Sequence, residues 1–370
     1  MTQAKLNPPF RADHVGSLLR PPQIFAMRDK VARGEATAED LRAVEDEAIS
    51  AMIPKLEATG IQAITDGEYR RAWFHLDFLE QLDGVTVTGM IQSSSDSESR
   101  VGVAPPKITV TGKLAHQHDI QVKDFEFVES HTDRFPKVCI PSPTMAHFRG
   151  GRAGIDIESY PDLDIFFEDL AQAYRDEIAH LYAVGCRYIQ LDDTNLAYLC
   201  DPKMREGAIE RGDDPDELPR TYAALINAAI RDVPDDMTTA VHLCRGNYKS
   251  TFFASGGYEP VAEVLFNELG VDAYFLEYDD ERSGDFAPLR FVPEDKTVVL
   301  GLVTSKRPEL ESEEDLLSRI EDADSHFAGG QLCLSPQCGF ASTMEGNALT
   351  EDEQWAKLRL VVSTAERAWG

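Results

Sequence analysis

Short apolar segments rich in valine, isoleucine and tyrosine recur along the chain, and longer amphipathic segments separate them. Eight of the apolar segments are strand candidates, at residues 12–16, 61–66, 138–141, 188–192, 239–243, 273–276, 297–302 and 331–335. Helical periodicity is found at residues 37–58, 163–183, 220–231, 258–269, 312–327 and 350–368. Strands and helices that alternate through eight repeats are typical of a TIM (β/α)8 barrel. We therefore predict an α/β fold in which residues 1–370 form one barrel domain.

Two stretches depart from this repeat. Residues 85–135 alternate β-branched and polar residues in VTVTGM, KITVTGKL and FEFVES, around a Ser/Asp-rich break at residues 93–99. This pattern predicts a β-hairpin excursion within the domain, with a mobile tip that serves as a lid. Residues 201–219 carry charge, glycine and proline without a strand pattern, which indicates an insertion after the fourth strand.

The charge balance narrows the classes of function. The 370 residues include 65 acidic and 36 basic side chains, so the formal net charge is −29. Such a field repels phosphates, which excludes nucleic acid and anionic membrane surfaces as partners. No segment has the roughly 20 apolar residues that cross a bilayer, and the first residues lack a signal-peptide core. We expect a cytoplasmic protein, and six cysteines in so long a chain favour reduced thiols or metal ligands over disulfides.

Reactive side chains gather where the predicted strands end, which is where a TIM barrel builds its active site. These strand-end residues are Asp66 and Glu68, Asp192 and Asp193, His242 and Cys244, Glu277 and Cys338, while His14, Gly16 and Ser17 belong to or follow the first strand. Because they come from different strands but from the same edge, we expect them to line one site.

A metal site is the first chemistry that these residues suggest. His242 and Cys244 are two apart, so their side chains point the same way from an extended strand end. Cys338 and Glu277 would complete a tetrahedral set, and zinc is the ion that best suits imidazole with thiolates. A zinc site with two thiolates keeps a bound thiol ionised and nucleophilic, which is the chemistry of alkyl transfer to sulfur.

The simpler interpretation of an isolated His-x-Cys is a buried thiol beside a hydrogen-bonded histidine. The coincidence of four compatible ligands at three predicted strand ends favours the metal. The remaining cysteines are interpreted one by one: Cys139, Cys186 and Cys333 lie in or next to predicted strands and belong to the core, whereas Cys200 lies in a loop and is left undecided.

Six ordered motifs resemble the catalytic half of cobalamin-independent methionine synthase. They are DHVGSLLRP at 13–21, ITDGEYRR at 64–71, IQLDDTNL at 189–196, VHLCRGN at 241–247, FLEYDD at 275–280 and LSPQCGF at 334–340. The chain is most similar to the single-barrel, stand-alone relatives of that family, the methyltetrahydropteroyltriglutamate–homocysteine S-methyltransferase-like proteins. The resemblance extends over nearly the whole chain.

The resemblance implies a role for individual residues. It implies that His242, Cys244, Glu277 and Cys338 bind zinc, although the spacing from Cys244 to Glu277 is longer than in the synthase. It also implies that the amino-acid part of homocysteine is held by Gly16, Ser17, Glu68 and Asp192. Such an arrangement is chemically sensible, because a carboxylate pair can hold an ammonium and backbone N–H groups can hold a carboxylate. The simpler alternatives are a loop acid paired with Arg70 or Arg71 for Glu68, and helix capping for Asp192 and Asp193.

The methyl donor is where the chain departs from the full synthase. The synthase has a second, N-terminal barrel that helps to bind a polyglutamylated folate, and this chain has no such barrel. The place of the family's pterin-stacking tryptophan reads PSPTMAHFRGG, with His147 or Phe148 near that position. A folate, a corrinoid carrier protein and another small methyl donor all stay open. For proton transfer or donor contact the candidates are His14, His75 and His147, with Asp192 as a further catalytic residue.

The sequence thus predicts a zinc-dependent S-methyltransferase that moves a methyl group to a small thiol, homocysteine being converted to methionine. One alternative is another zinc-thiolate alkyl transfer, such as epoxide opening by coenzyme M, for which a sulfonate would need arginines. Four are available, namely Arg20, Arg70, Arg71 and Arg245. The alternative from another class is a zinc-binding protein without catalysis. The oligomeric state is open, and a homo-oligomer is compatible with the sequence.

Overall fold

The central element is a six-stranded parallel sheet with the order β10-β9-β8-β7-β6-β5. The structure is a computed structural model and describes residues 8–90, 106–327 and 330–370. The strands of this sheet are β5 (Val138–Pro141), β6 (Tyr188–Asp193), β7 (Thr238–Leu243), β8 (Ala273–Glu277), β9 (Thr297–Val303) and β10 (Gln331–Pro336). Nearly all of their residues are buried, as expected for parallel strands covered by helices.

Next to β5, strand β1 (Ala63–Ile64) pairs in parallel with β4 (Phe135–Pro136), which ends one residue before β5 begins. Seven of the eight predicted strand segments therefore contain strands. The first, residues 12–16, contributes a single parallel bridge between Ala12 and Leu334 of β10. Two carbonyl groups of this segment accept hydrogen bonds from neighbouring side chains instead. Lys137 donates to the carbonyl of His14, and Thr65 donates to that of Gly16. The predicted α/β class with a parallel sheet is confirmed.

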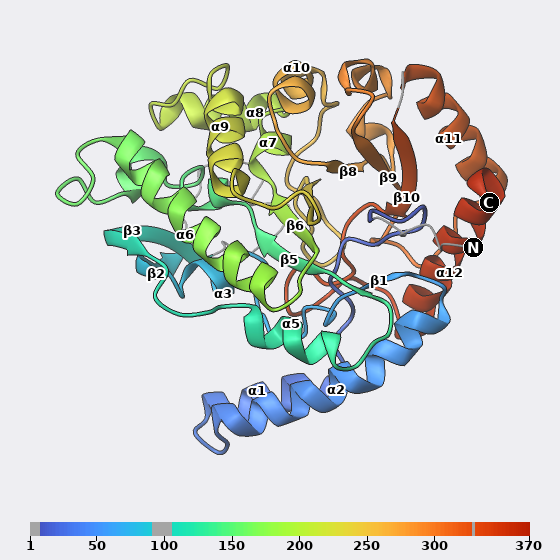
Figure 1. Cartoon of the computed structure of the whole chain (residues 1–370), viewed down its shortest axis with the longest axis horizontal. Coiled ribbons are helices and arrows are strands. Elements are labelled where there is room, and N and C mark those ends of the chain that lie inside the picture. Colours follow the sequence, from blue (N-terminus) through green and yellow to red (C-terminus); the bar gives the residue numbers. More distant parts are fainter. Residues whose placement is uncertain (1–7, 91–105, 328–329) are drawn as a thin grey trace.

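Helices cover the outside of the sheet (Figure 1). Those that match the predicted helical segments are α2 (Ala38–Ala58), α6 (Leu163–Ala183), α9 (Leu218–Ile230), α10 (Glu259–Asn267), α11 (Glu313–His326) and α12 (Glu351–Trp369). They follow the predicted segments because each has an apolar face, and several begin at a capping side chain. Thr37 and Thr350 form capping boxes with Asp40 and Glu353. No helix in the described part of the chain is long and apolar enough to span a membrane.

Further helices lie outside the predicted repeat. They are α1 (Pro22–Ala32), α3 (Leu76–Leu79), α5 (Val122–Glu129), α7 (Asn195–Tyr198) and α8 (Pro202–Glu210), with 3-10 turns at Pro143–Ala146, Gly151–Gly154, Glu281–Ser283 and Ala287–Phe291. The insertion predicted at residues 201–219 contains α8, which begins at the capping carboxylate of Asp201.

An antiparallel hairpin stands apart from the main sheet. Strand β2 (Asp83–Met90) pairs with β3 (Pro106–Ala115), with Val85 opposite Val110. The Ser/Asp-rich tip at residues 93–99 lies outside the described residues. The sequence predicts that the FEFVES segment belongs to the hairpin. In the structure this segment lies mostly in α5 instead. The reason is its longer context, since Val122, Phe125 and Val128 are spaced by three and form one buried helical face.

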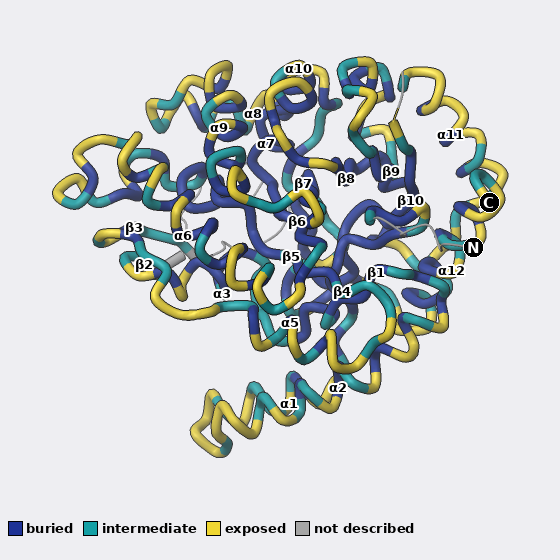
Figure 2. Tube along the Cα trace, viewed as in Figure 1, coloured by how far each residue is buried: buried dark blue, intermediate teal, exposed yellow. Residues whose placement is uncertain are grey.

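The middle of the sheet holds a buried ion pair that the sequence pattern did not reveal. Lys137 Nζ lies 3.3 Å from Asp13 Oδ1 and donates to the carbonyl of His14 at 2.6 Å, and both charged side chains are fully buried. The ammonium also lies 4.2 Å from the ring centroid of Phe275, and the Tyr188 hydroxyl donates to Asp13 at 2.9 Å. These contacts hold the first segment of the chain against the buried centre of the sheet (Figure 2).

We predict that Lys137→Met destabilises the protein by about 3 kcal/mol or more, because it leaves the Asp13 carboxylate buried without its partner. The free energy of unfolding is measured by urea denaturation followed by circular dichroism. The matched control is Lys55→Met, which removes an exposed ion pair with Glu351 of 2.6 Å and should change stability by less than about 1 kcal/mol. Equal effects of the two substitutions would contradict a supporting role for the buried pair.

Candidate functional site

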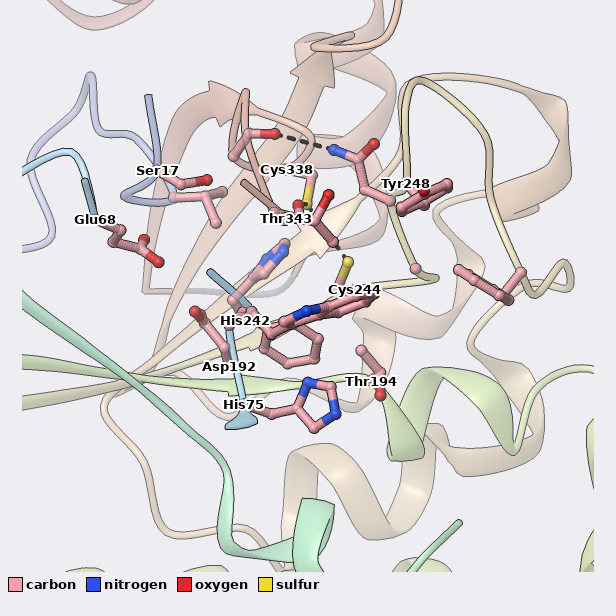
Figure 3. A pocket seen from close by; sticks show the side chains of 18 of the residues that line it. Ser17, Glu68, His75, Asp192, Thr194, His242, Cys244, Tyr248, Cys338 and Thr343 are labelled. Atoms are coloured by element: carbon pink, nitrogen blue, oxygen red, sulfur yellow. Dashed lines mark hydrogen bonds between the residues drawn. The ribbon is translucent and has the colours of Figure 1, made fainter. Parts of the chain in front are cut away.

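A cavity lies at the carboxyl ends of the parallel strands. Its lining comes from the first segment of the chain and from the residues that end or follow β1, β6, β7 and β10. Three chemical groups of residues share it: the acids Glu68 and Asp192; the metal-ligand types His242, Cys244 and Cys338; and an aromatic end with Trp73, Phe74, Tyr198, Tyr248 and Phe253. Figure 3 shows the first two groups on neighbouring parts of the cavity wall.

The four predicted metal ligands are brought together. One ligand atom from each of His242, Cys244, Glu277 and Cys338 lies within 4.8 Å of the others, and all four residues are buried. His242 and Cys244 come from the end of β7, Glu277 ends β8, and Cys338 follows β10. Three of the four line the cavity, while Glu277 lies behind them.

Unsatisfied atoms show that this cluster fits a cation. Neither ring nitrogen of His242 makes a hydrogen bond of ordinary geometry among the described residues, although the ring interacts with the Cys338 thiol, and Oε1 of Glu277 has no hydrogen-bond partner there. The two sulfur atoms are 3.4 Å apart, in hydrogen-bond contact, and both thiols are free (Figure 3). Buried polar atoms without partners are rare in native proteins. An ion bound by imidazole, two thiolates and a carboxylate would satisfy one ring nitrogen of His242, the carboxylate oxygen and both sulfur atoms at once.

The pKa shifts around the sulfur pair also favour a bound cation. The hydrogen bond from Cys244 lowers the pKa of Cys338 well below its usual value, and the same bond raises the pKa of Cys244. Burial raises the pKa of Glu277, whose Oε2 accepts the backbone N–H of Arg245 at 3.2 Å. Burial away from water disfavours the charged forms of acidic groups. A bound divalent cation would favour the charged forms again.

Glu68 owes its place in the cavity to a tight turn after β1. Gly67 and Glu68 both adopt left-handed backbone conformations, with φ of 66° and 55°. The Glu68 N–H donates to Asp66 at 2.7 Å, and the Glu68 carboxylate pairs with Arg71. The simpler interpretation of Glu68, an acid paired with a nearby arginine, therefore describes one of its contacts. The strained turn nevertheless directs its carboxylate toward the cavity.

Asp192 reaches the same wall from the end of β6. Its Oδ1 accepts a hydrogen bond of 2.7 Å from Gln190. Burial and the nearby charge of Glu68 raise the pKa of Asp192 to about 7, and burial raises that of Glu68 as well. Two buried carboxylates that repel each other form a site for a cation, and a ligand's ammonium group would relieve the repulsion.

Gly16 and Ser17 complete this wall. At Gly16 φ is 137°, and a Cβ atom there would lie 2.3 Å from Oε1 of Glu68 and 2.8 Å from Sγ of Cys139. Only glycine therefore leaves room for the observed position of the Glu68 carboxylate. Ser17 lines the cavity beside it (Figure 3). The four residues expected to hold the amino-acid part of the acceptor are thus neighbours.

Two predicted catalytic histidines are not among the cavity-lining residues that the structure describes. His14 donates to the carbonyl of Ala63 at 3.0 Å, and burial lowers its pKa to about 4. His147 is hydrogen-bonded to Tyr222 at 2.9 Å, and burial lowers its pKa to about 4 as well. Each ring makes one internal hydrogen bond, and the second ring nitrogen of His147 has no partner in the described part of the chain. Both histidines thus lie outside this cavity, and proton transfer by either stays a prediction.

Other predicted residues have structural positions. Phe148 packs against Tyr198 and Tyr222 in the core. Asp193 accepts the N–H of Leu196 at 2.8 Å and so caps the short helix α7. Among the cysteines, the sulfurs of Cys139, Cys186 and Cys200 contact backbone carbonyls within their own surroundings, and Cys333 is buried in the centre of the sheet.

The aromatic end of the cavity was largely missed from the sequence. Trp73 and Tyr248 stack with ring centroids 6.4 Å apart and an interplanar angle of 9°. His75, the third histidine candidate, does line this end, and neither of its nitrogens has a partner in the described part of the chain. Burial and the nearby charge of Arg149 lower its pKa well below the usual value. The signal was present in the consecutive aromatic residues 73–75, which begin five positions after the last residue of the Asp-Gly-Glu turn.

Comparison with known proteins places these features in a family. The chain is 47% identical to the uncharacterized protein YxjH of Bacillus subtilis, over 100% of this chain and 97% of that one. A solved structure from Listeria monocytogenes, provisionally assigned as a vitamin-B12-independent methionine synthase, is 40% identical with a TM-score of 0.78 and 98% coverage of both chains.

More distant matches are consistent with this. A methionine synthase of Pyrococcus abyssi is 24% identical over 88% of this chain and 84% of its own length. A B12-independent methionine synthase structure from Shewanella, 20% identical with a TM-score of 0.73, covers 96% of this chain and 97% of its own and shares the fold. The family model of the cobalamin-independent synthase catalytic domain matches residues 10–367. The chain therefore belongs to the family of cobalamin-independent methionine synthase catalytic domains.

Proposed function

We propose that this protein is a zinc-dependent S-methyltransferase that methylates homocysteine to methionine. The observation that carries the proposal is the shared cavity, in which metal-type ligands and an acidic pair form adjoining parts of the wall. Longer relatives named as homocysteine methyltransferases, such as one from Thermosynechococcus vestitus at 24% identity, support the choice of acceptor.

His242, Cys244, Glu277 and Cys338 are the residues that would hold the zinc, and their unsatisfied buried atoms fit an ion of this kind. When bound, zinc would stabilise the thiolate form of an acceptor thiol at neutral pH. Because Glu277 lies behind the other three residues, the cavity side of the cluster is open for a substrate sulfur. A substrate sulfur would add to these four ligands or displace one of them from the cavity side, whereas a purely structural site with four ligands would have no cavity beside it.

The residues beside the cluster would orient the acceptor. Glu68 and Asp192 would bind its ammonium group, which relieves the repulsion between the two buried carboxylates. Ser17, next to this pair, would bind its carboxylate through hydrogen-bond donors. Held at its amino-acid end, the acceptor would direct its thiol toward the sulfur pair, and fixed positioning of this kind lowers the entropic part of the barrier.

The methyl donor would bind at the aromatic end. Trp73 and Tyr248 offer flat apolar surfaces, and both His75 and Arg149 have nitrogens that lack partners within the described ranges. His75 would act there as a neutral hydrogen-bonding group, since its pKa is well below the usual value. A folate, a methyl group presented by a corrinoid protein and another small methylated compound all remain candidates.

The structure weakens the coenzyme M alternative, because the arginines proposed for a sulfonate are engaged elsewhere. Arg20 donates to the carbonyls of Glu68 and Arg71, and Arg245 to those of Gly256 and Glu277. Arg70 pairs with Asp46 and Asp124. Arg71 lines the cavity but pairs with Glu68. An amino-acid thiol suits the acidic wall better than a sulfonate thiol does.

We also propose that the parallel strands close into a barrel. We infer that residues 12–16 act as the first strand of a TIM (β/α)8 barrel in a single domain. Support comes from contacts on both sides of this segment. Asp13 N–H donates to Leu334 of β10 at 3.0 Å, and the backbone N–H of Leu18 donates to Gly67, after β1, at 3.0 Å.

We predict that the purified protein retains about one zinc ion after dialysis against a weak chelator, as expected for one mononuclear thiolate site. His242→Ala and Cys338→Ala should each abolish this retention, because each removes a cavity-side ligand. Cys186→Ala, a buried cysteine distant in sequence from the cluster, is the matched control and should keep its zinc. Metal content is measured by mass spectrometry. Wild-type protein without zinc, or equal loss in the control, would rule the site out.

We further predict that the zinc-loaded protein binds homocysteine at least about tenfold more tightly than 4-sulfanylbutanoate, which lacks only the amino group. One charge-assisted contact is worth roughly 1.5–3 kcal/mol, or about ten- to a hundredfold. In Glu68→Gln and Asp192→Asn this preference should fall below about threefold, while affinity for the amino-free thiol stays within about twofold.

Calorimetric titration measures both ligands. The amino-free thiol serves as the internal control, because it reports any damage to the metal cluster separately from the loss of ammonium binding. An unchanged preference in both variants would remove the acidic wall from the acceptor site.

A further inference from the structure

A second group of potential metal ligands lies on the outside of the molecule, where β3 leads into α5 beside the last turns of α6. His116 and Asp119 belong to the loop between β3 and α5, and His180 is on α6. One ligand atom from each of the three lies within 4.8 Å of the others. The rings of the two histidines pack edge to face, with centroids 5.3 Å apart. We propose that His116, Asp119 and His180 form a peripheral site for a divalent transition-metal ion.

A buried carboxylate prepares His116 for this role. The Nε2–H group of His116 donates to Oε2 of Glu177 at 2.6 Å, and the side chains of the pair are 2% and 0% exposed. The same carboxylate accepts the backbone N–H groups of Ile120 and Gln121 at 3.0 and 2.6 Å. Glu177 thereby fixes the ring and its tautomer and leaves the lone pair on Nδ1. A carboxylate behind a histidine is the usual support of a metal-binding imidazole.

The second histidine is arranged in a similar way but at the surface. His180 Nδ1 donates to Asp119 Oδ1 at 2.6 Å, and these side chains are 53% and 47% exposed. The ring therefore keeps one bare nitrogen, and the carboxylate keeps a second oxygen. Because both side chains are exposed, they can rotate about their side-chain bonds without disturbing the core, and an ion can reach them from solvent.

Binding requires the two surface side chains to rotate. Two ligand atoms bound at about 2.1 Å to one tetrahedral ion lie about 3.4 Å apart. The present ligand atoms lie within 4.8 Å of one another, and the 2.6 Å contact in which His180 Nδ1 donates to Asp119 would give way as both exposed side chains turn toward the ion. Water would complete the coordination. Two imidazoles and one carboxylate suit Zn²⁺, Ni²⁺, Co²⁺ or Cu²⁺ rather than Ca²⁺ or Mg²⁺, which prefer sets made of oxygen alone.

An ion at this place would join two parts of the fold that differ in kind. Glu177 and His180 are three residues apart on α6, which is joined to β5 of the main sheet by the hydrogen bond from Tyr174 to Pro141, whereas His116 and Asp119 follow the hairpin formed by β2 and β3. Metal binding would tie the end of the hairpin to α6. The peripheral site would therefore stabilise the hairpin segment against local opening, independently of the chemistry in the cavity.

The test is a calorimetric titration of the full chain with Zn²⁺, after its tightly bound metal has been replenished with zinc and excess removed. We expect wild-type protein to bind one additional equivalent that His180→Ala lacks or binds at least about tenfold more weakly. His326→Ala is the matched control, since it removes an exposed histidine that faces Asp322 at 3.7 Å and belongs to no metal-ligand cluster in the described ranges.

A titration with Co²⁺ separates the two sites by their spectra. Cobalt bound by thiolates shows sulfur-to-metal charge transfer in the near ultraviolet, whereas the peripheral site has no sulfur and should give only weak visible bands. Hydrogen exchange of residues 116–121 should slow on zinc addition in wild type and in His326→Ala, and stay unchanged in His180→Ala.

Equal zinc binding by wild type and His180→Ala would overturn the proposal, and so would equal losses in His180→Ala and His326→Ala. In either case the two histidines form only the hydrogen bonds already seen with Glu177 and Asp119. Because the readout is the difference between variants outside the cavity, it does not depend on the proposed methyltransferase activity.

Discussion

The arrangement of the cavity depends on one electrostatic constraint, namely that buried ligand atoms without hydrogen-bond partners favour a bound cation. His242, Cys244, Glu277 and Cys338 are all buried. Within the described residues the histidine nitrogens make no hydrogen bond of ordinary geometry, and one carboxylate oxygen has no hydrogen-bond partner. Apolar residues of the same size would pack there with less loss of hydration. The parallel strands make this cluster possible because their carboxyl ends bring residues distant in sequence to one edge.

A second, similar constraint acts a short way along the same wall. Glu68 and Asp192 are held close enough for the charge of one to raise the pKa of the other, and the glycine at position 16 leaves room for the Glu68 carboxylate. A cationic group on a substrate would relieve this repulsion, whereas the neighbouring sulfur pair suits a metal. The cavity therefore suits positive charge at two places, a metal ion at the sulfur pair and an ammonium group at the two carboxylates. A substrate with a thiol and an ammonium group at the right distance could bind the metal with its sulfur and the carboxylates with its ammonium group.

Much of this was predictable from the sequence, for reasons that particular residues illustrate. The His-x-Cys pair at the end of a buried strand, the Asp-Gly-Glu turn and the Pro-x-Cys-Gly loop are local patterns, so their positions at strand ends could be read directly. What the sequence could not place depends on distant contacts. His14 and His147 look reactive in isolation, but both lie outside this cavity, and Ala63 and Tyr222 occupy one nitrogen of each. The buried pair of Lys137 and Asp13, 124 positions apart, and the stacking of Trp73 on Tyr248 exist only through the tertiary fold.

X-ray absorption at the zinc edge is the most direct test of whether the cluster activates a substrate thiol. The measurement compares the zinc-loaded protein with and without homocysteine. We expect about two sulfur scatterers around zinc in the free protein, from Cys244 and Cys338, and about one more when homocysteine is added. A zinc shell that stays the same with homocysteine, or that contains no sulfur, would contradict thiol activation at this site.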